Sequence, residues 1–148
     1  MFRQIIVGLD GSVKARKAAH VAFDLARLYD GTVTLVHVLH PEAADFTSES
    51  DIDYEAEINR DTYAEVEEAG QKIIDDGLKI ADDVGCKKVE TQMPYGDAAT
   101  EILAHADQIE ADLIVTGRRG LSSVSGLVLG STTQRINHLA KCACLSIP

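Results

Sequence analysis

The sequence predicts an α/β fold in which a parallel sheet of five strands is covered by helices on both faces. Three observations carry this prediction. Short apolar runs alternate with longer segments of helical periodicity. A hydrophobic content of 45% with only 5% aromatics and no tryptophan describes a core of Val, Ile, Leu and Ala, as parallel sheets under helices prefer. A length of 148 residues suits one domain, residues 1–148.

The first forty residues predict a strand, a helix and a second strand. The run at 3–10 contains IIVGL and is apolar enough for a central strand. Residues 10–12, DGS, turn the chain, and Ser12 caps a helix whose small apolar residues recur every three or four positions up to Gly31. TVTLVHVL at 32–39 is the second strand. In a strand-helix-strand unit of this kind, the connection between the two parallel strands is expected to be a right-handed crossover.

The remainder of the chain continues the alternation. Residues 40–51 lack periodicity and predict a loop before a long helix that runs to about residue 84. Gly70 and Gly77 weaken this helix, so a bend is expected there. The predicted elements that follow are a polar strand nearer a sheet edge at 87–93, a helix at about 98–106, the strand ADLIVT at 111–116, a short helix at about 132–140 and the last strand CACLSI at 142–147.

The charge distribution excludes some classes of partner. A net charge of −10 argues against a general nucleic-acid binder, which needs a basic face. Residues 42–84 hold 15 acids against three bases, a net of −12, and the rest of the chain carries 9 acids and 11 bases, a net of +2. A solvated helix face explains the acidic block most simply, with adaptation to high salt or a basic partner as alternatives.

Neither a membrane span nor an export signal is visible in the sequence. No apolar stretch approaches the ~20 residues that a spanning helix needs, and the first residues, MFRQIIVGLDGS, lack a signal peptide's long apolar segment. We therefore expect a cytoplasmic protein that binds no membrane.

The cysteines and histidines predict little chemistry. Cys86, Cys142 and Cys144 are an odd number, so a disulfide framework is not expected. Cys142 and Cys144 lie two apart, which on a strand puts both sulfurs on one face, and small buried hydrophobes explain them best. No histidine stands at zinc-site spacing from them. Structural or solvated roles are expected for the five histidines: His20, His37, His40, His105 and His138.

The most informative stretch is GRRGLSSVSGLVLGSTT at 117–133, between a predicted strand and a predicted helix. Glycine lets the backbone take positive φ and approach a ligand closely. A helix N-terminus offers free N–H groups and a positive dipole end, which suit an anion. No lysine precedes the Ser/Thr as in a Walker A loop, and the glycines are too far apart for GxGxxG. Ordinary turn and cap residues remain the alternative explanation.

The pattern G-x2-G-x9-G-[ST] after a D-L-I-V-x-G strand resembles the nucleotide-binding motif of the universal stress protein family, in its ATP-binding subgroup. Its fixed positions are matched by Gly117, Gly120, Gly130 and Ser131. The resemblance covers nearly the whole chain, including DGS, VHV and GDAATEILAHADQIEADLIVTG. It implies a three-layer Rossmann-like fold, similar to adenine nucleotide alpha hydrolases, with strand order 3-2-1-4-5. That order would bring Asp10 and Gly117 to one crevice where the winding reverses.

The resemblance also implies a ligand and a set of contacts. The ligand would be ATP, or ADP or AMP, with Mg²⁺ or Mn²⁺ held mainly through the phosphates. By position, Asp10 and the backbone of Val38 would face the adenine, Gly117 the ribose, and Gly120, Gly130, Ser131 and Thr132 the phosphates. Arg118 and Arg119 would meet phosphates or screen charge, or be solvated loop arginines. Asp10 has an alternative role as a turn residue.

We expect a stress-response regulator that binds ATP and hydrolyses it slowly at most. Fast phosphoryl transfer needs added positive charge and a residue that positions the nucleophile, and no lysine, HRD-like segment or paired metal carboxylates were identified for this. No catalytic residue is assigned. Adenylyl-transferring enzymes would need an HxGH or SGGxDS signature after the first strand, where this chain has GLDGS. A receiver-like phosphoacceptor would need paired acids there.

The alternative is a homodimeric interaction module that works without nucleotide. The final apolar strand at a probable sheet edge invites pairing with a second copy, and family members dimerise through it. Lys141 and Ala143 stand where the family commonly has proline, and Ser146 interrupts the apolar run. The resemblance therefore implies a homodimer but leaves its detailed geometry open.

Overall fold

The computed structural model describes residues 1–40, 52–118 and 130–148, and of residues 52–61 it describes the backbone only. The described residues form one parallel sheet of order β3-β2-β1-β4-β5. The strands are β1 (Gln4–Gly8), β2 (Thr32–Val36), β3 (Val89–Gln92), β4 (Leu113–Gly117) and β5 (Ala143–Ile147). The helices are α1 (Val13–Tyr29), α2 (Ile52–Val84), α3 (Ala98–Gln108) and α4 (Ser131–Leu139). The expected α/β fold and strand order are confirmed.

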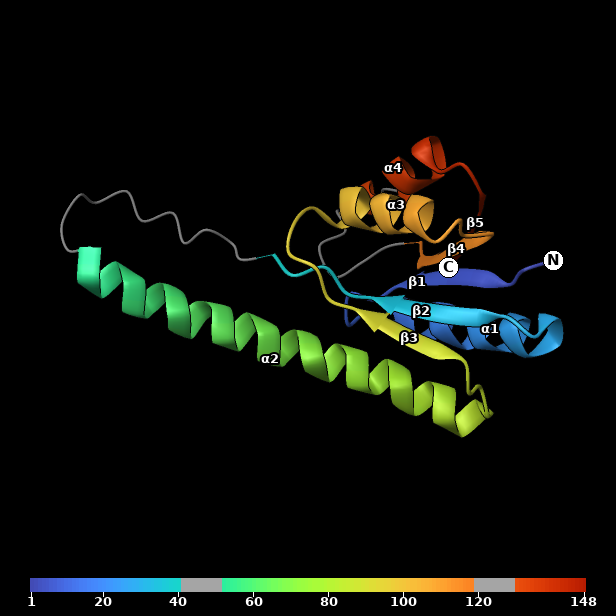
Figure 1. Ribbon diagram of the computed structural model, residues 1–148, viewed down its shortest axis with the longest axis horizontal. Helices are drawn as coiled ribbons and strands as arrows, with labels where there is room; N and C mark the ends of the chain where they lie inside the picture. The colour runs from blue at the N-terminus through green and yellow to red at the C-terminus, as the bar shows by residue number, and fades with distance from the viewer. Residues whose placement is uncertain (41–51, 119–129) are drawn as a thin grey trace.

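The central strand β1 separates two apolar cores. Figure 1 shows α1 and α2 on one side of the sheet and α3 and α4 on the other. Ile5 and Val7 of β1 pack into the core under α1 and α2, and Ile6 between them packs into the core under α3 and α4. All three side chains are fully buried. A strand buried on both faces reads as a continuous apolar run, which is why IIVGL indicated a central position.

Helix α1 begins and packs as its sequence predicts. The Oγ of Ser12 accepts a hydrogen bond from the N–H of Ala15 at 3.1 Å and so caps the helix. The buried face of the helix consists of Ala15, Ala18, Ala19, Ala22, Phe23 and Ala26. Because most of these side chains are methyl groups, the helix axis can approach the sheet closely.

Helix α2 is one continuous helix of 33 residues, and Figure 1 shows it as a long rod without a sharp kink. The two glycines that predicted a bend have a packing role instead. A Cβ on Gly70 would lie 2.7 Å from Cδ2 of Leu39, and a Cβ on Gly77 would lie 2.8 Å from Cδ1 of Leu35. These glycines let the helix backbone rest on the leucines of the sheet. The acidic side chains of residues 65–83 are exposed, in agreement with a solvated face.

Gly77→Ala is expected to destabilise the protein even though alanine is the better helix former. Alanine gains about 1 kcal/mol of helix propensity over glycine in an open helix. At this position the new methyl group would press on Leu35 and Leu9, both buried, and overpacking costs about 1–3 kcal/mol. Urea unfolding should show a net loss, whereas exposed Lys79→Ala should change little. A stabilised Gly77→Ala variant would contradict this packing role.

Candidate functional site

A crevice is expected where the carboxyl ends of β1 and β4 meet. β1 pairs with β2 on one side and with β4 on the other, so the chain winds in opposite directions from this point. In open α/β sheets ligands bind at such a switch point. The structure brings Asp10, Val38 and Gly117 to this end of the sheet, and α4 begins there. Arg119 and Gly120 lie outside the described residues, so their predicted roles stay predictions.

Asp10 occupies the turn that follows β1. Its Oδ1 accepts a hydrogen bond from the N–H of Ser12 at 2.9 Å, so its role as a turn residue is present in the structure. Among the described residues the other carboxylate oxygen of Asp10 has no hydrogen-bond partner, and the side chain is half-buried. One oxygen therefore orders the turn and the other is available to a ligand.

Val38 offers its backbone to the crevice. Its side chain is buried in the core under α3 and α4. The N–H groups of its neighbours His37 and Leu39 donate to the carbonyls of Gln92 and Pro94, on the side of β3. Since backbone groups alternate in direction along a strand, the N–H and C=O of Val38 point to the opposite side, beyond the end of β1. This is the geometry that an adenine edge would need.

Gly117 ends β4 directly against the first turn of α1. A Cβ at this position would lie 3.0 Å from Cβ of Lys14 and 3.1 Å from the backbone N of Ala15. The carbonyl oxygen of Gly117 accepts a hydrogen bond from Oγ1 of Thr133 at 2.8 Å, and Thr133 is buried. The glycine thus connects α1 on one face of the sheet with α4 on the other.

Two backbone hydrogen bonds order the chain on either side of residues 119–129. The N–H of Arg118 donates to the carbonyl of Ile147 at 2.7 Å, and the N–H of Gly130 donates to the carbonyl of Arg118 at 2.8 Å. The amide of Gly130 is therefore already used by the protein. If an anion binds here, Gly130 can contribute only the space left by its missing side chain, and the donors must come from the residues after it.

The N-terminus of α4 provides those donors. Gly130 is the N-cap and makes no side-chain capping bond, and the first backbone bond into the helix runs from the N–H of Gln134 to the carbonyl of Gly130. The N–H groups of residues 131–133 precede this bond and have no intrahelical acceptor. Ser131 is exposed and Thr132 is half-buried. With the dipole of about +0.5 charge at this end, the site favours an anion.

Arg118, whose carbonyl accepts the N–H of Gly130, carries a donor that is unsatisfied among the described residues. Its Nε is buried and has no hydrogen-bond partner in the described structure. Buried donors of this kind almost always have an acceptor, and an anionic ligand or a water would supply one. The observation favours a ligand role for Arg118 over the alternative of a solvated loop arginine. Together with the α4 amides, it shows that the residues present fit a phosphate group.

Sequence reasoning missed three residues of this region. Lys14 contacts Gly117 from α1, Thr133 ties α4 to Gly117, and Nδ1 of His37 lies 2.7 Å from the carbonyl oxygen of Leu9, just before Asp10. Each contact joins segments that are far apart in the chain. Only Thr133 lay within the recognised motif, as the residue after its Ser-Thr.

Asp97 links α3 to α4 beside the crevice. Its Oδ2 accepts hydrogen bonds from Oγ1 and N of Thr100, at 2.7 and 3.0 Å, and lies 2.6 Å from Nη1 of Arg135. The Thr100 hydrogen bonds, joined by Arg135, lower the pKa of Asp97 to about 2. The carboxylate both caps α3 and holds the first turns of the two helices together.

The stabilising effect of Asp97 is expected to depend on pH. Because the pKa is lowered on folding, the stabilisation is present above the unfolded-state pKa of ~3.9 and is lost as the pH falls toward about 2. Asp97→Asn keeps a capping side chain but removes the charge. Unfolding measured from pH 7 to pH 2 should show a wild-type advantage that shrinks below pH 4. A difference independent of pH would contradict the charge-based account.

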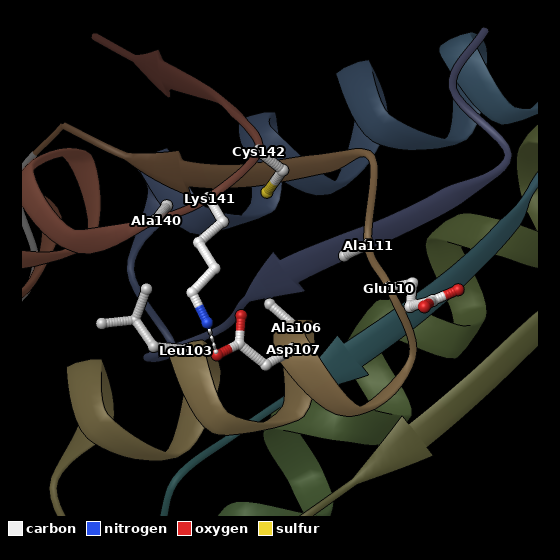
Figure 2. Close-up of a pocket in the computed structure, with 8 residues that line it drawn as sticks. All are labelled: Leu103, Ala106, Asp107, Glu110, Ala111, Ala140, Lys141 and Cys142. Atoms are coloured by element: carbon white, nitrogen blue, oxygen red, sulfur yellow. Dashed lines mark hydrogen bonds and ion pairs between the residues drawn. The ribbon is translucent and has the colours of Figure 1, made fainter.

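A separate cavity of about 350 Å³ lies at the opposite, amino end of the sheet. Figure 2 shows Lys141 reaching across it to Asp107, with the Nζ to Oδ2 distance at 2.7 Å. The cavity is lined by Leu103, Ala106, Asp107, Glu110, Ala111, Ala140, Lys141 and Cys142. Burial raises the pKa of Cys142, which keeps its thiol protonated and favours a packing role.

Two negative findings concern the described residues alone. Within them no three His, Cys, Asp or Glu side chains gather to hold a metal ion. No helix in these parts of the chain combines the length and the apolar character required to cross a membrane.

The fold defines a Rossmann-like α/β protein with a doubly wound parallel sheet. The model of the "Universal stress protein family" matches residues 1–148, and the chain belongs to this family. The universal stress protein YxiE of Bacillus subtilis is 32% identical over 148 residues, covering 99% of each chain. The structure of UspA from Lactobacillus plantarum is similar, with a TM-score of 0.79, 24% identity and coverage of 99% of this chain and 98% of that one.

Two further solved structures contain ligands named in their descriptions. A universal stress protein in complex with cAMP matches with a TM-score of 0.73 and 23% identity over 99% of this chain and 97% of that one. The universal stress protein from Archaeoglobus fulgidus in complex with dAMP matches with a TM-score of 0.67 and 19% identity over 100% of this chain and 98% of that one. At these identities the likeness establishes the shared fold.

Proposed function

We propose that this protein binds an adenine nucleotide in the crevice and acts as a nucleotide-dependent regulator in the stress response. The observation that carries the proposal is the Nε of Arg118, which is buried and has no hydrogen-bond partner among the described residues. The carbonyl of the same residue bonds to Gly130, the N-cap of α4. A phosphate group would satisfy both this Nε and the free amides at the start of α4. The cAMP and dAMP complexes of similar proteins support adenine as the base.

The ligand would extend across the carboxyl end of the sheet. The adenine would contact the free carboxylate oxygen of Asp10 and the backbone of Val38, and the ribose would lie on Gly117. The phosphates would meet Ser131, Thr132 and Arg118, and by the family motif also Arg119, Gly120 and Gly130. We propose ATP as the ligand, with ADP or AMP as alternatives. Mg²⁺ or Mn²⁺ would be held mainly by the phosphates, whose charge it would reduce.

Hydrolysis of the bound ATP would be slow. Phosphoryl transfer needs a group that orients the attacking water and positive charge that increases in the transition state. The described part of the crevice offers the amides of α4, Arg118 and Lys14 for charge. Among these described residues the acid is Asp10, which would lie at the adenine end, away from the phosphate that would react. The arrangement therefore holds a nucleotide rather than turning it over.

The protein is also proposed to form a homodimer through β5. This strand pairs only with β4 among the described strands and lies at the sheet edge. Its residues after Ala143 are half-buried, although the strand ends one side of the sheet. An edge of this kind is completed by a second copy. Sedimentation at tens of micromolar protein should show a dimer, and a monomer alone would refute this part of the proposal.

Isothermal titration with ATP in the presence of Mg²⁺ tests the proposed function. Saturable binding of ATP is expected, with GTP as a control for recognition of the base. Absence of saturable binding at millimolar ATP would refute it. In that case a stable dimer without nucleotide would favour the second candidate, an interaction module, which the sheet edge at β5 and the internally bonded amide of Gly130 support.

A further inference from the structure

We infer that Lys14 makes this crevice discriminate between nucleotides by the number of their phosphates, preferring ATP over AMP. The inference rests on the proposed function and adds a residue outside the glycine-rich motif. Lys14 would be a binding contact to the distal phosphates.

Lys14 stands at the crevice because of the packing of Gly117. Lys14 is the second residue of α1, and its Cβ lies 3.0 Å from where a Cβ on Gly117 would be. The lysine stem therefore starts against the last residue of β4, on the α1 side of the sheet, while the amides of α4 lie on the other side. A flexible stem of four carbons lets the ammonium group reach over the carboxyl end of the sheet.

The charge at this position is unusual for a helix start. The first turn of α1 contains no acidic residue, whereas α3 has Glu101 in its first turn. A cation at a helix N-terminus is disfavoured by the helix dipole, and acids are the residues that stabilise it. Local rules of this kind are most often broken at functional sites. A bound polyphosphate would turn the unfavourable charge into an attractive one.

No acid of the described chain neutralises Lys14. Three other described lysines pair with acids: Lys72 with Glu68, Lys88 with Asp30 and Lys141 with Asp107. Lys17, Lys79 and Lys87 make no ion pair with a described residue either, but these three are exposed, whereas Lys14 is half-buried. Asp10, the nearest acid in sequence, uses one oxygen for the N–H of Ser12 and makes no ion pair with Lys14 in the described structure. Because Lys14 is half-buried, part of its side chain packs against the protein and is less free than that of a fully exposed lysine.

These features predict how affinity changes with ligand charge. The amides of α4 and Arg118 can satisfy one phosphate, which AMP also has. Lys14, as a second cation, would increase the affinity only of ligands whose additional phosphates extend to its ammonium group. The attraction between Lys14 and the ligand should therefore increase from AMP to ATP and decrease with added salt.

Lys14→Gln and Arg16→Gln provide a matched pair of variants for this inference. Both remove one positive charge from the first turns of α1, but residue 16 is two positions further on, faces away from residue 14 and is exposed. Dissociation constants for AMP, ADP and ATP would be measured by titration at fixed ionic strength. Circular dichroism would establish that each variant is folded.

Lys14→Gln is expected to weaken ATP binding about tenfold and AMP binding less than threefold, as loss of a charge-assisted contact predicts. Arg16→Gln should change each constant less than twofold. Equal weakening of ATP and AMP by Lys14→Gln, or none, would overturn the role of Lys14 while leaving the proposed function intact. Failure of the unmodified protein to bind any of the three nucleotides would overturn both.

Discussion

Replacement of Gly117 by alanine is expected to abolish nucleotide binding in a chain that still folds. The added Cβ would lie 3.0 Å from Cβ of Lys14 and 3.1 Å from the backbone N of Ala15, which is closer than such atoms normally approach. The backbone of Ala15 cannot rotate out of the way as the end of a side chain can, so α1 and the end of β4 must move apart. The hydrogen bond from Thr133 to Gly117 would shift, and with it the surface on which we propose that the ribose lies.

The cost in stability should be tolerable. Overpacking of this kind costs about 1–3 kcal/mol, within the total of about 5–15 kcal/mol that a domain of this class has. Binding would be measured by titration with ATP well below the unfolding temperature. We expect a loss of affinity of at least a hundredfold, because an ångström-scale shift misplaces every contact around the phosphates.

Gly8→Ala is the matched control for this variant. Gly8 ends β1 next to the same crevice, but its added Cβ would meet only side-chain tips, Cδ1 of Ile102 at 3.1 Å and Cγ2 of Thr116 at 3.7 Å. A tip at 3.1 Å has to move by only a few tenths of an ångström, whereas the two leucine tips under Gly77, at 2.8 and 2.9 Å, must both move further. Gly8→Ala should therefore keep most of the affinity. If Gly117→Ala bound ATP as tightly as the unmodified protein, Gly117 would not shape the binding site.

Gly31→Ala is expected to cause the largest loss of stability among the substitutions considered. A Cβ on Gly31 would lie 2.5 Å from the carbonyl oxygen of Phe2 and 3.1 Å from Cα of Arg3. The next residue, Thr32, donates its N–H to the carbonyl of Arg3 at 2.8 Å and so starts the pairing of β2 with β1. The methyl group must push these two strands apart at their first contact. We expect a loss of about 3 kcal/mol or more.

Gly85→Ala separates crowding from backbone strain. Gly85 has a φ of 75°, which alanine adopts at a cost of about 1 kcal/mol, but nothing lies within 4 Å of its added Cβ. Chemical unfolding should show a much smaller loss for Gly85→Ala than for Gly31→Ala. Similar losses for both variants would mean that the start of β2 can move to make room, and the predicted clash would be wrong.

The helices and strands, and their succession along the chain, could be predicted because each element depends on local patterns. The apolar run at 3–10 and the small-residue stripe of α1 required only periodicity, and the structure agrees within a few residues at each end. The strand order itself came from the family resemblance, since residue patterns alone do not say which strands are neighbours. The Ser12 cap was also predictable, because a capping side chain acts on residues three positions away.

The errors concern contacts between distant segments. Gly70 and Gly77 were interpreted as weak points of α2, but they are the places where the helix rests on Leu39 and Leu35. Helix propensity describes a residue within an isolated helix and does not include its contacts with other elements of the fold. Likewise the motif placed Gly130 at the phosphates by its position alone, and it could not report that the amide of Gly130 pairs with the carbonyl of Arg118.

The position of Lys14 shows the same limit within the candidate site. Lys14 and Gly117 are separated by more than a hundred residues, and no local pattern reports their contact. The glycine-rich motif could be recognised because its residues are sequential. That Lys14 lies beside this motif follows only from the pairing of β1 with β4 in the folded sheet.

The most direct test of the proposed nucleotide site is the change in backbone amide NMR shifts of the ¹⁵N-labelled protein on titration with ATP and Mg²⁺. Binding as proposed should move the amides of Ser131, Thr132 and Arg118 most, together with that of Val38. Shifts confined to the cavity around Lys141 and Asp107, at the other end of the sheet, or no shifts at millimolar ATP, would contradict it.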